Sequence, residues 1–107
     1  MKLPVNAHID PRKLSEYLRR RLEDDKSAFL ESAGYTTDNA GRLLMDIREQ
    51  ILPLDAEFIE QTEYGPKYRI RGTLTGPNRR VLGVVTIWMT EDATNRTKFV
   101  TLFPDKL

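Results

Sequence analysis

The sequence predicts an α+β fold, with two to three N-terminal helices packed on one face of a four-stranded antiparallel β-meander. Up to Ile51, apolar residues recur every three or four positions, which is typical of amphipathic helices. From Asp55 onward the apolar period changes to two, which indicates strands with one buried face. The loops between these strands are short, so consecutive strands should pair with one another. Helices first and strands second is the arrangement of α+β domains.

Composition limits the classes of protein to consider. At 107 residues, we expect a single domain over residues 1–107. The chain has no cysteine and one histidine, which excludes disulfides, thiolate metal sites and histidine-rich metal sites. No apolar run approaches the roughly 18 residues of a membrane span. We therefore expect a cytoplasmic protein with no cofactor, no bound metal and no membrane contact.

The helices are predicted from their start signals and apolar stripes. Asp10 followed by Pro11 is a typical N-cap and first helical residue. Gly34 fits the left-handed position that ends a helix. The predicted helices cover residues 11 to about 23, residues 26–33, and the stretch from Thr36 or Thr37 to Pro53.

The strands are predicted at about 57–62, 67–74, 80–90 and 97–103, and alternation then assigns their side chains to two faces. The residues expected to face the helices are Tyr68, Ile70, Leu74, Val81, Val85, Ile87, Met89, Val100 and Leu102. The residues expected to face outward are Arg69, Arg71, Thr86, Trp88, Thr101 and Phe99.

A local excess of positive charge falls on the second and third strands. Residues 64–80 hold five basic side chains and no acidic one, although the net charge of the whole chain is only +1. Arginines that bind phosphates beside rings that stack on unpaired bases are typical of a nucleic-acid platform. The residues predicted to bind nucleic acid are Lys67, Arg69, Trp88 and Phe99.

Several segments together carry a resemblance. They are Lys26-Ser-Ala-Phe-Leu-Glu-Ser-Ala-Gly-Tyr, Tyr64-Gly-Pro-Lys-Tyr-Arg-Ile-Arg-Gly, Gly76-Pro-Asn, Val85-Thr-Ile-Trp-Met and Phe99-Val-Thr-Leu-Phe-Pro. The chain resembles, over most of its length, a family of short bacterial proteins classed as a domain of unknown function. A more distant similarity, in architecture and in the ending Val-Thr-Leu-Phe-Pro, is to metal-independent RNase toxins of the barnase, colicin and RelE kind. That similarity implies an active site on the open sheet face.

One departure from the family pattern bears on the chemistry. Related sequences often carry a histidine shortly before the position of Lys26, whereas residues 22–25 here read Leu-Glu-Asp-Asp. A catalytic role for that histidine would leave this chain impaired or dependent on another base. His8, the only histidine, lies in an extended N-terminal segment, where a lone histidine is more often incidental.

Cleavage of RNA by its own 2′-hydroxyl requires a base, an acid and cations for the crowded phosphate. The predicted catalytic residues are Arg71, Thr86, Thr101 and Lys26, with the basic groups as cations and the threonines orienting a phosphate oxygen. Structural alternatives stay open for each group. The arginines can instead pair with Glu57 or Glu60, the threonines can serve as strand formers, and Trp88 can cover the sheet or fill a homodimer interface.

The sequence thus favours a small RNA-binding protein or metal-independent RNase, as the toxin of a bacterial toxin–antitoxin pair. The alternative is a protein-interaction module, such as an antitoxin, immunity or adaptor protein, that uses the same open sheet face. The expected partner is RNA in the first case and a cognate protein in the second.

Overall fold

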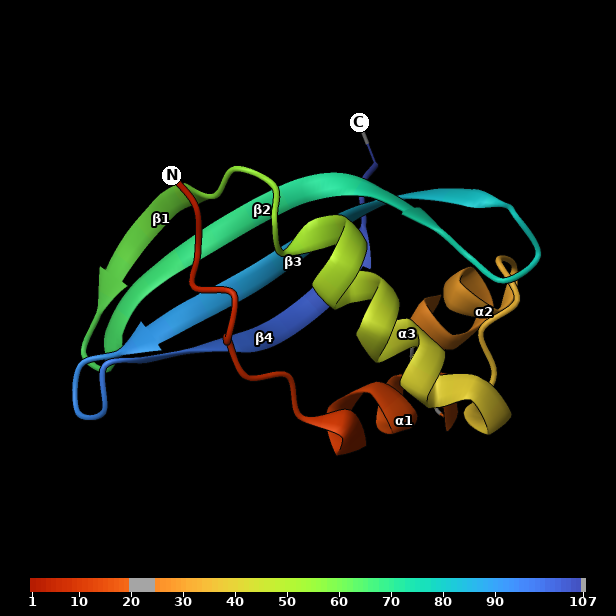
Figure 1. The fold of residues 1–107 in the computed structure, drawn as a ribbon, viewed down its shortest axis with the longest axis horizontal. Coiled ribbons are helices and arrows are strands. Elements are labelled where there is room, and N and C mark those ends of the chain that lie inside the picture. The colour runs from red at the N-terminus through yellow and green to blue at the C-terminus, as the bar shows by residue number, and fades with distance from the viewer. Residues whose placement is uncertain (20–24, 107) are drawn as a thin grey trace.

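The computed structural model describes residues 1–19 and 25–106 and confirms the α+β class (Figure 1). Four antiparallel strands follow the helices and lie in the order β1-β2-β3-β4, so the predicted meander is confirmed. The helices are α1 (Pro11–Arg19), α2 (Asp25–Glu31), the 3-10 turn η1 (Thr37–Asn39), α3 (Ala40–Asp46) and the π-helical turn η2 (Ile47–Ile51). The strands are β1 (Glu57–Thr62), β2 (Gly65–Thr75), β3 (Val81–Glu91) and β4 (Arg96–Pro104).

Local signals in the sequence explain where the helices begin and end. The Asp10 carboxylate accepts a hydrogen bond from the Arg12 backbone N–H at 3.0 Å, which satisfies one of the free donors at the start of α1. Gly34 has a φ of 97°, the left-handed conformation predicted for it after α2. The part of the predicted first helix beyond Arg19 lies outside the described residues.

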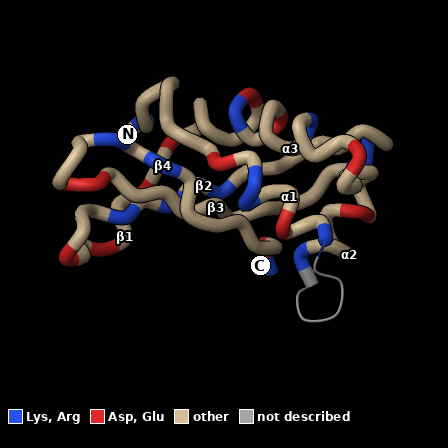
Figure 2. The backbone as a smooth tube through the Cα atoms, turned by 90° about the horizontal axis from the view of Figure 1, so that it is seen from below, with Lys and Arg blue, Asp and Glu red and all other residues tan. Residues whose placement is uncertain are grey.

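The helices pack on one face of the sheet, and their apolar stripes join that face in a single hydrophobic core. Figure 2 shows α3 lying along one side of the strand layer, with basic and acidic positions interspersed along the chain. The fully buried core residues include Leu14, Leu30, Leu43, Ile47, Ile51, Ile70, Leu74, Val84, Trp88 and Leu102. No helix in the described ranges combines the length and apolar character needed to cross a bilayer.

The face assignment predicted for β3 is wrong. Trp88 pairs with Tyr68, and Thr86 pairs with Ile70, so these residues share the helix-covered face of the sheet. Trp88 and Thr86 are both 0% exposed, and Phe99, which pairs with Trp88, is 3% exposed. The opposite face carries Val85, Ile87 and Met89, which were expected to face the helices.

The polar groups of Thr86 and Trp88 form hydrogen bonds inside the protein. The Thr86 hydroxyl donates to the Ile70 carbonyl at 3.1 Å and accepts a hydrogen bond from the Trp88 indole N–H at 2.8 Å. The Trp88 ring also packs edge-on against Phe99, with ring centroids 5.3 Å apart. Trp88 therefore covers the sheet beneath the helices, as the structural alternative proposed.

The N-terminal segment crosses from β1 to β4. The Ala56 N–H donates to the Met1 carbonyl at 2.7 Å near the start of β1. At the other end, His8 forms a parallel bridge with Lys98, so that it lies at the outer edge of β4. This crossing places the only histidine of the chain beside β4.

A buried polar network anchors α3. The Tyr35 hydroxyl donates to the Asp46 carboxylate at 2.6 Å, and the Arg42 Nε donates to the same carboxylate at 3.0 Å. Burial first, and then the Asp46 carboxylate, raises the pKa of the Tyr35 phenol. The network ties the segment after α2 to α3.

We expect Asp46→Ala to lower the free energy of unfolding by about 2–3 kcal/mol, because it removes the charged acceptor from a buried phenol. The other acceptor of Tyr35, the Thr75 carbonyl, is 3.4 Å away. Urea denaturation followed by circular dichroism measures the loss. Asp38→Ala, at an exposed acid, is the matched control, and equal stability of the two variants would contradict the importance of the network.

Candidate functional site

The sheet face opposite the helices, which we call the open face, carries the basic residues of β2. Arg69 pairs with Ile87 and Arg71 pairs with Val85, so both arginines lie on this face. Thr101 of β4 pairs with Ile87 from the other side, which places it in the same row as Arg69, two strands away. Adjacent strands lie about 4.8 Å apart, so this row spans roughly 10 Å.

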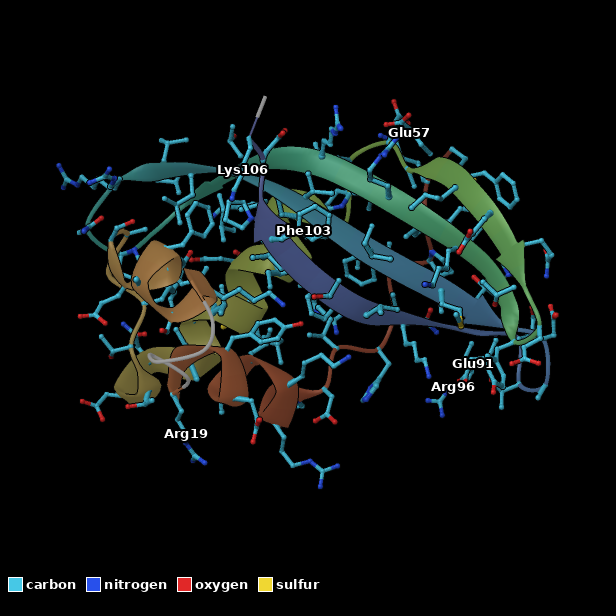
Figure 3. All side chains as sticks on the ribbon, turned by 180° about the vertical axis from the view of Figure 1, so that it is seen from behind. Arg19, Glu57, Glu91, Arg96, Phe103 and Lys106 are labelled. Atoms are coloured by element: carbon cyan, nitrogen blue, oxygen red, sulfur yellow. The ribbon has the colours of Figure 1, made fainter. Side chains whose placement is uncertain are left out.

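The open face carries one aromatic ring that sequence reasoning missed. Phe103 pairs with Val85 and therefore lies in the row of Arg71. It is 38% exposed and lies near the C-terminal end of β4 (Figure 3). Phe103 lies two residues after Thr101 on the same strand, and this spacing, which puts both side chains on one face, could have identified it.

The two arginines differ in their environment. Arg69 Nη2 donates to the Glu57 carboxylate at 3.3 Å, which is one of the pairings proposed as an alternative. Arg71 is exposed and makes no ion pair with another residue in the described ranges. Arg71 is therefore the more available cation of the pair.

The Thr101 hydroxyl accepts hydrogen bonds from two residues of the helices. Lys26 Nζ and Tyr17 Oη each donate a hydrogen bond to Thr101 Oγ1, and both distances are 3.1 Å. Lys26 Nζ also lies 4.4 Å from the centroid of the Tyr17 ring, a cation–π geometry. A hydroxyl has two acceptor lone pairs and one hydrogen. Because both lone pairs are engaged, the Thr101 hydrogen is left to donate to a third group.

A second lysine lies beside this contact. Lys13 Nζ donates to the Val100 carbonyl at 2.6 Å. Burial first, then the positive charge of Lys98 and, more weakly, that of Lys26 lower the pKa of Lys13, while the negative charge of Asp10 opposes them. Lys13 therefore lies within electrostatic range of both other ammonium groups and of the Asp10 carboxylate. We call Lys13, Tyr17, Lys26 and Thr101 the β4 cluster.

A β-bulge explains how β4 presents these groups. The register shifts between Ile87 and Trp88, which pair with Thr101 and Phe99, so that Val100 is an extra residue without a partner on β3. A bulge leaves main-chain groups of the extra residue free of the ladder and redirects its neighbours. The free carbonyl of Val100 accepts the hydrogen bond from Lys13, and Thr101 lies within reach of α1 and α2.

The structure therefore regroups the residues that the sequence singled out. Lys26 and Thr101 are in direct contact, and Lys67, Arg69 and Arg71 lie on the open face. The expectation that Thr86, Trp88 and Phe99 would be exposed on that face is wrong, because all of them are buried against the helices. Sequence reasoning did not identify Lys13 or Tyr17, whose contacts with β4 join residues more than 80 positions apart.

Comparisons with known proteins agree with the fold. The chain is similar to one chain of a contact-dependent growth inhibition toxin–immunity protein complex from Klebsiella pneumoniae 342, with a TM-score of 0.65 and 12% identity. The match covers 91% of this chain and 98% of that chain, and at this identity it shows a shared fold. No curated protein matches the sequence. The family model described as Domain of unknown function (DUF6883) matches residues 3–106, so the chain belongs to that family.

Proposed function

We propose that this protein binds RNA across its open face and cleaves it at the β4 cluster, as the toxin of a toxin–immunity pair. The observation that carries the proposal is the convergence of Lys26 Nζ and Tyr17 Oη on Thr101 Oγ1, beside Lys13. A phosphodiester is an anion that ammonium and hydroxyl donors bind through charge-assisted hydrogen bonds.

The proposed reaction is attack of the substrate's own 2′-oxygen on the adjacent phosphorus, which requires no metal. The 2′-oxygen loses its proton to a base and the P–O5′ bond breaks. The 5′-oxygen gains a proton, and the products are a 2′,3′-cyclic phosphate and a 5′-hydroxyl end. Lys26 would neutralise the charge that builds on the phosphate, and Thr101 would donate a hydrogen bond to it. Lys13, with its lowered pKa, is the member of the cluster best suited to move a proton.

The rest of the open face suits a single strand of RNA. Lys67 and Arg71 would contact phosphates, and the exposed ring of Phe103 would stack on a base. Phe103 thus replaces the buried Trp88 and Phe99 as the proposed stacking residue. The fold is shared with a chain of a toxin–immunity protein complex, which supports a role in such a pair, as either the toxin or the immunity protein.

Thr101→Val tests the proposal because valine keeps the shape of threonine and removes its hydroxyl. We expect purified wild-type protein to cleave RNA in the presence of a chelator and to leave 2′,3′-cyclic phosphate ends. We expect the variant to cleave about 10- to 100-fold more slowly, since a hydrogen bond to a charged group contributes about 1.5–3 kcal/mol. The measurement is single-turnover cleavage of a labelled RNA.

Thr94→Val, in the exposed turn between β3 and β4, is the matched control and should cleave at the wild-type rate. Wild-type protein that leaves RNA intact, or a Thr101→Val variant as fast as Thr94→Val, would overturn the proposal.

A second candidate function is protein interaction, as in an immunity or adaptor protein. It is favoured by β1, an edge strand on which Phe58 and Ile59 are 58% and 39% exposed. The surface first considered for this role, around Trp88 and Phe99, is buried. A cognate protein that loses affinity for Phe58→Ala, together with no cleavage of RNA by the wild type, would favour this candidate.

A further inference from the structure

A pocket of about 680 Å³ lies at the end of the sheet where the two hairpins meet. This volume falls within the usual range for small-molecule sites. Lysines from three elements line it: Lys13 of α1, Lys67 of β2 and Lys98 of β4, with His8 beside them. The pocket is distinct from the contact between Lys26 and Thr101, which do not line it, and Lys13 is shared between the two.

The charges in this pocket leave a surplus of positive groups. Two carboxylates line it as well, but each already has a cationic neighbour. Glu91 pairs with Lys98 at 3.3 Å, and Asp10 pairs with Arg12 at 3.5 Å. Lys13 donates to a main-chain carbonyl, and Lys67 makes no ion pair with another described residue. Lys67 is therefore available to an anion. Lys13 has two further N–H donors for one, and it feels the negative charge of Asp10 as well as the positive charges of Lys98 and Lys26.

The same pocket also offers apolar and aromatic surface. Met89 and Phe99, which are 8% and 3% exposed, are among the residues that line it. Tyr64 lines it from the turn between β1 and β2 and is 66% exposed. An exposed phenol ring beside lysines matches the two halves of a nucleotide, because the ring can stack on a base while ammonium groups bind its phosphate.

The position of Tyr64 is fixed by its turn. Gly65 has a φ of 144°, and a Cβ on this residue would collide with the Thr90 carbonyl oxygen. The turn therefore packs directly on β3, and the Asp92 N–H donates to the Tyr64 carbonyl at 2.9 Å. The backbone that carries the Tyr64 ring is therefore fixed by the turn.

We propose that this pocket binds a nucleoside monophosphate unit, with its phosphate on Lys13 and Lys67 and its base against Tyr64. If the proposed function holds, the unit belongs to an RNA strand whose scissile phosphate lies at the β4 cluster. The same chemistry fits a free nucleotide, so the test includes both sources.

The experiment titrates the protein with adenosine 5′-monophosphate and with inorganic phosphate, followed by ¹H–¹⁵N NMR. We expect Lys67→Gln to weaken both ligands about 5- to 10-fold. We expect Tyr64→Ala to weaken the nucleotide about 5-fold or more, because base stacking is lost, and to leave inorganic phosphate unchanged. Lys106→Gln removes a charge outside the pocket (Figure 3), and Phe58→Ala removes an exposed ring that does not line it. Both variants should bind as the wild type does.

An eight-nucleotide RNA provides the second arm. Weaker RNA binding by Lys67→Gln and Tyr64→Ala assigns the pocket to a unit of the strand. Unchanged RNA binding with weaker nucleotide binding assigns it to a free nucleotide, and both results support the site. If Lys67→Gln and Tyr64→Ala bind the nucleotide as tightly as the two control variants do, the proposed site is overturned. The cleavage rate of Thr101→Val is measured separately, so failure of the proposed function and failure of this pocket are distinguishable.

Discussion

Trp88→Ala should lower the free energy of unfolding by about 3–5 kcal/mol, the usual cost of removing a large aromatic side chain from a core. Trp88 is 0% exposed and is the largest fully buried side chain in the described part of the protein. Its removal takes away one of the two edge-on partners of Phe99, the one whose ring centroid is 5.3 Å away, and removes the indole donor to Thr86. Small domains are stable by about 5–15 kcal/mol, so this change removes a large share of the total.

Urea denaturation followed by far-ultraviolet circular dichroism measures this loss and does not depend on tryptophan fluorescence. Arg71→Ala is the matched control because it alters the exposed face of the neighbouring strand, and it should change stability by no more than about 0.5 kcal/mol. A loss below about 1 kcal/mol for Trp88→Ala would mean that the indole is exposed, as first predicted.

The fold class was predictable because the spacing of apolar residues differs between two separate parts of the chain. The three- and four-residue spacing ends near Ile51 and the two-residue spacing begins near Asp55. Pro11, Gly34 and Pro53 fall at helix boundaries for stereochemical reasons that do not depend on the tertiary structure. Short loops between strands then leave the meander as the simplest topology.

The direction in which β3 faces was not predictable from its own residues. Both of its faces are apolar, with Val85, Ile87 and Met89 on one and Val84 and Trp88 on the other. Alternation therefore fits either assignment, and a shift of one residue inverts every side chain. The register with β2 decides the matter, because it places Trp88 opposite Tyr68 on the face that also buries Ile70 and Leu74. The relevant signal was the apolar pattern of the partner strand.

The site was only partly predictable for a different reason. Lys26 and Thr101 were both recognised as candidates, yet 75 residues separate them and no local pattern predicts their contact. That contact depends on the bulge at Val100, which changes the register by one residue. Lys13 and Tyr17 fit the helical pattern of α1 and carry no separate signal. Their proximity to β4 is a property of the packing of α1 against the sheet edge.

The lysines also explain why net charge was a poor guide to the site. The whole chain is nearly neutral at +1, and the basic stretch of residues 64–80 drew the prediction to β2. Lys13 instead lies within electrostatic range of both Lys26 and Lys98, and the three lysines come from three separate elements. Local potential in a folded protein depends on such convergence more than on the sequence average.

Lys26→Gln should slow RNA cleavage by about 100- to 1,000-fold, the effect usually seen when one group that stabilises transition-state charge is removed. Glutamine keeps a hydrogen-bond donor but carries no charge, so the variant removes the cation near Thr101 Oγ1 while it keeps a polar side chain there. Binding of uncleaved RNA should weaken far less, and the slope of log affinity against log salt should fall by about one phosphate contact. Single-turnover cleavage and salt-dependent binding of a labelled RNA measure these two effects separately.

Lys106→Gln removes the same charge from the exposed end of the chain and should match the wild type in both assays. The free energy of unfolding of Lys26→Gln should fall by no more than about 1 kcal/mol, the usual contribution of a cation–π contact such as the one with the Tyr17 ring, since Lys26 lies outside the buried core. A large and selective loss of cleavage in a variant that remains folded would place Lys26 in transition-state stabilisation. Equal losses of cleavage and binding would instead make it a general contact to the RNA backbone, and a cleavage rate within threefold of the wild type would remove it from the site.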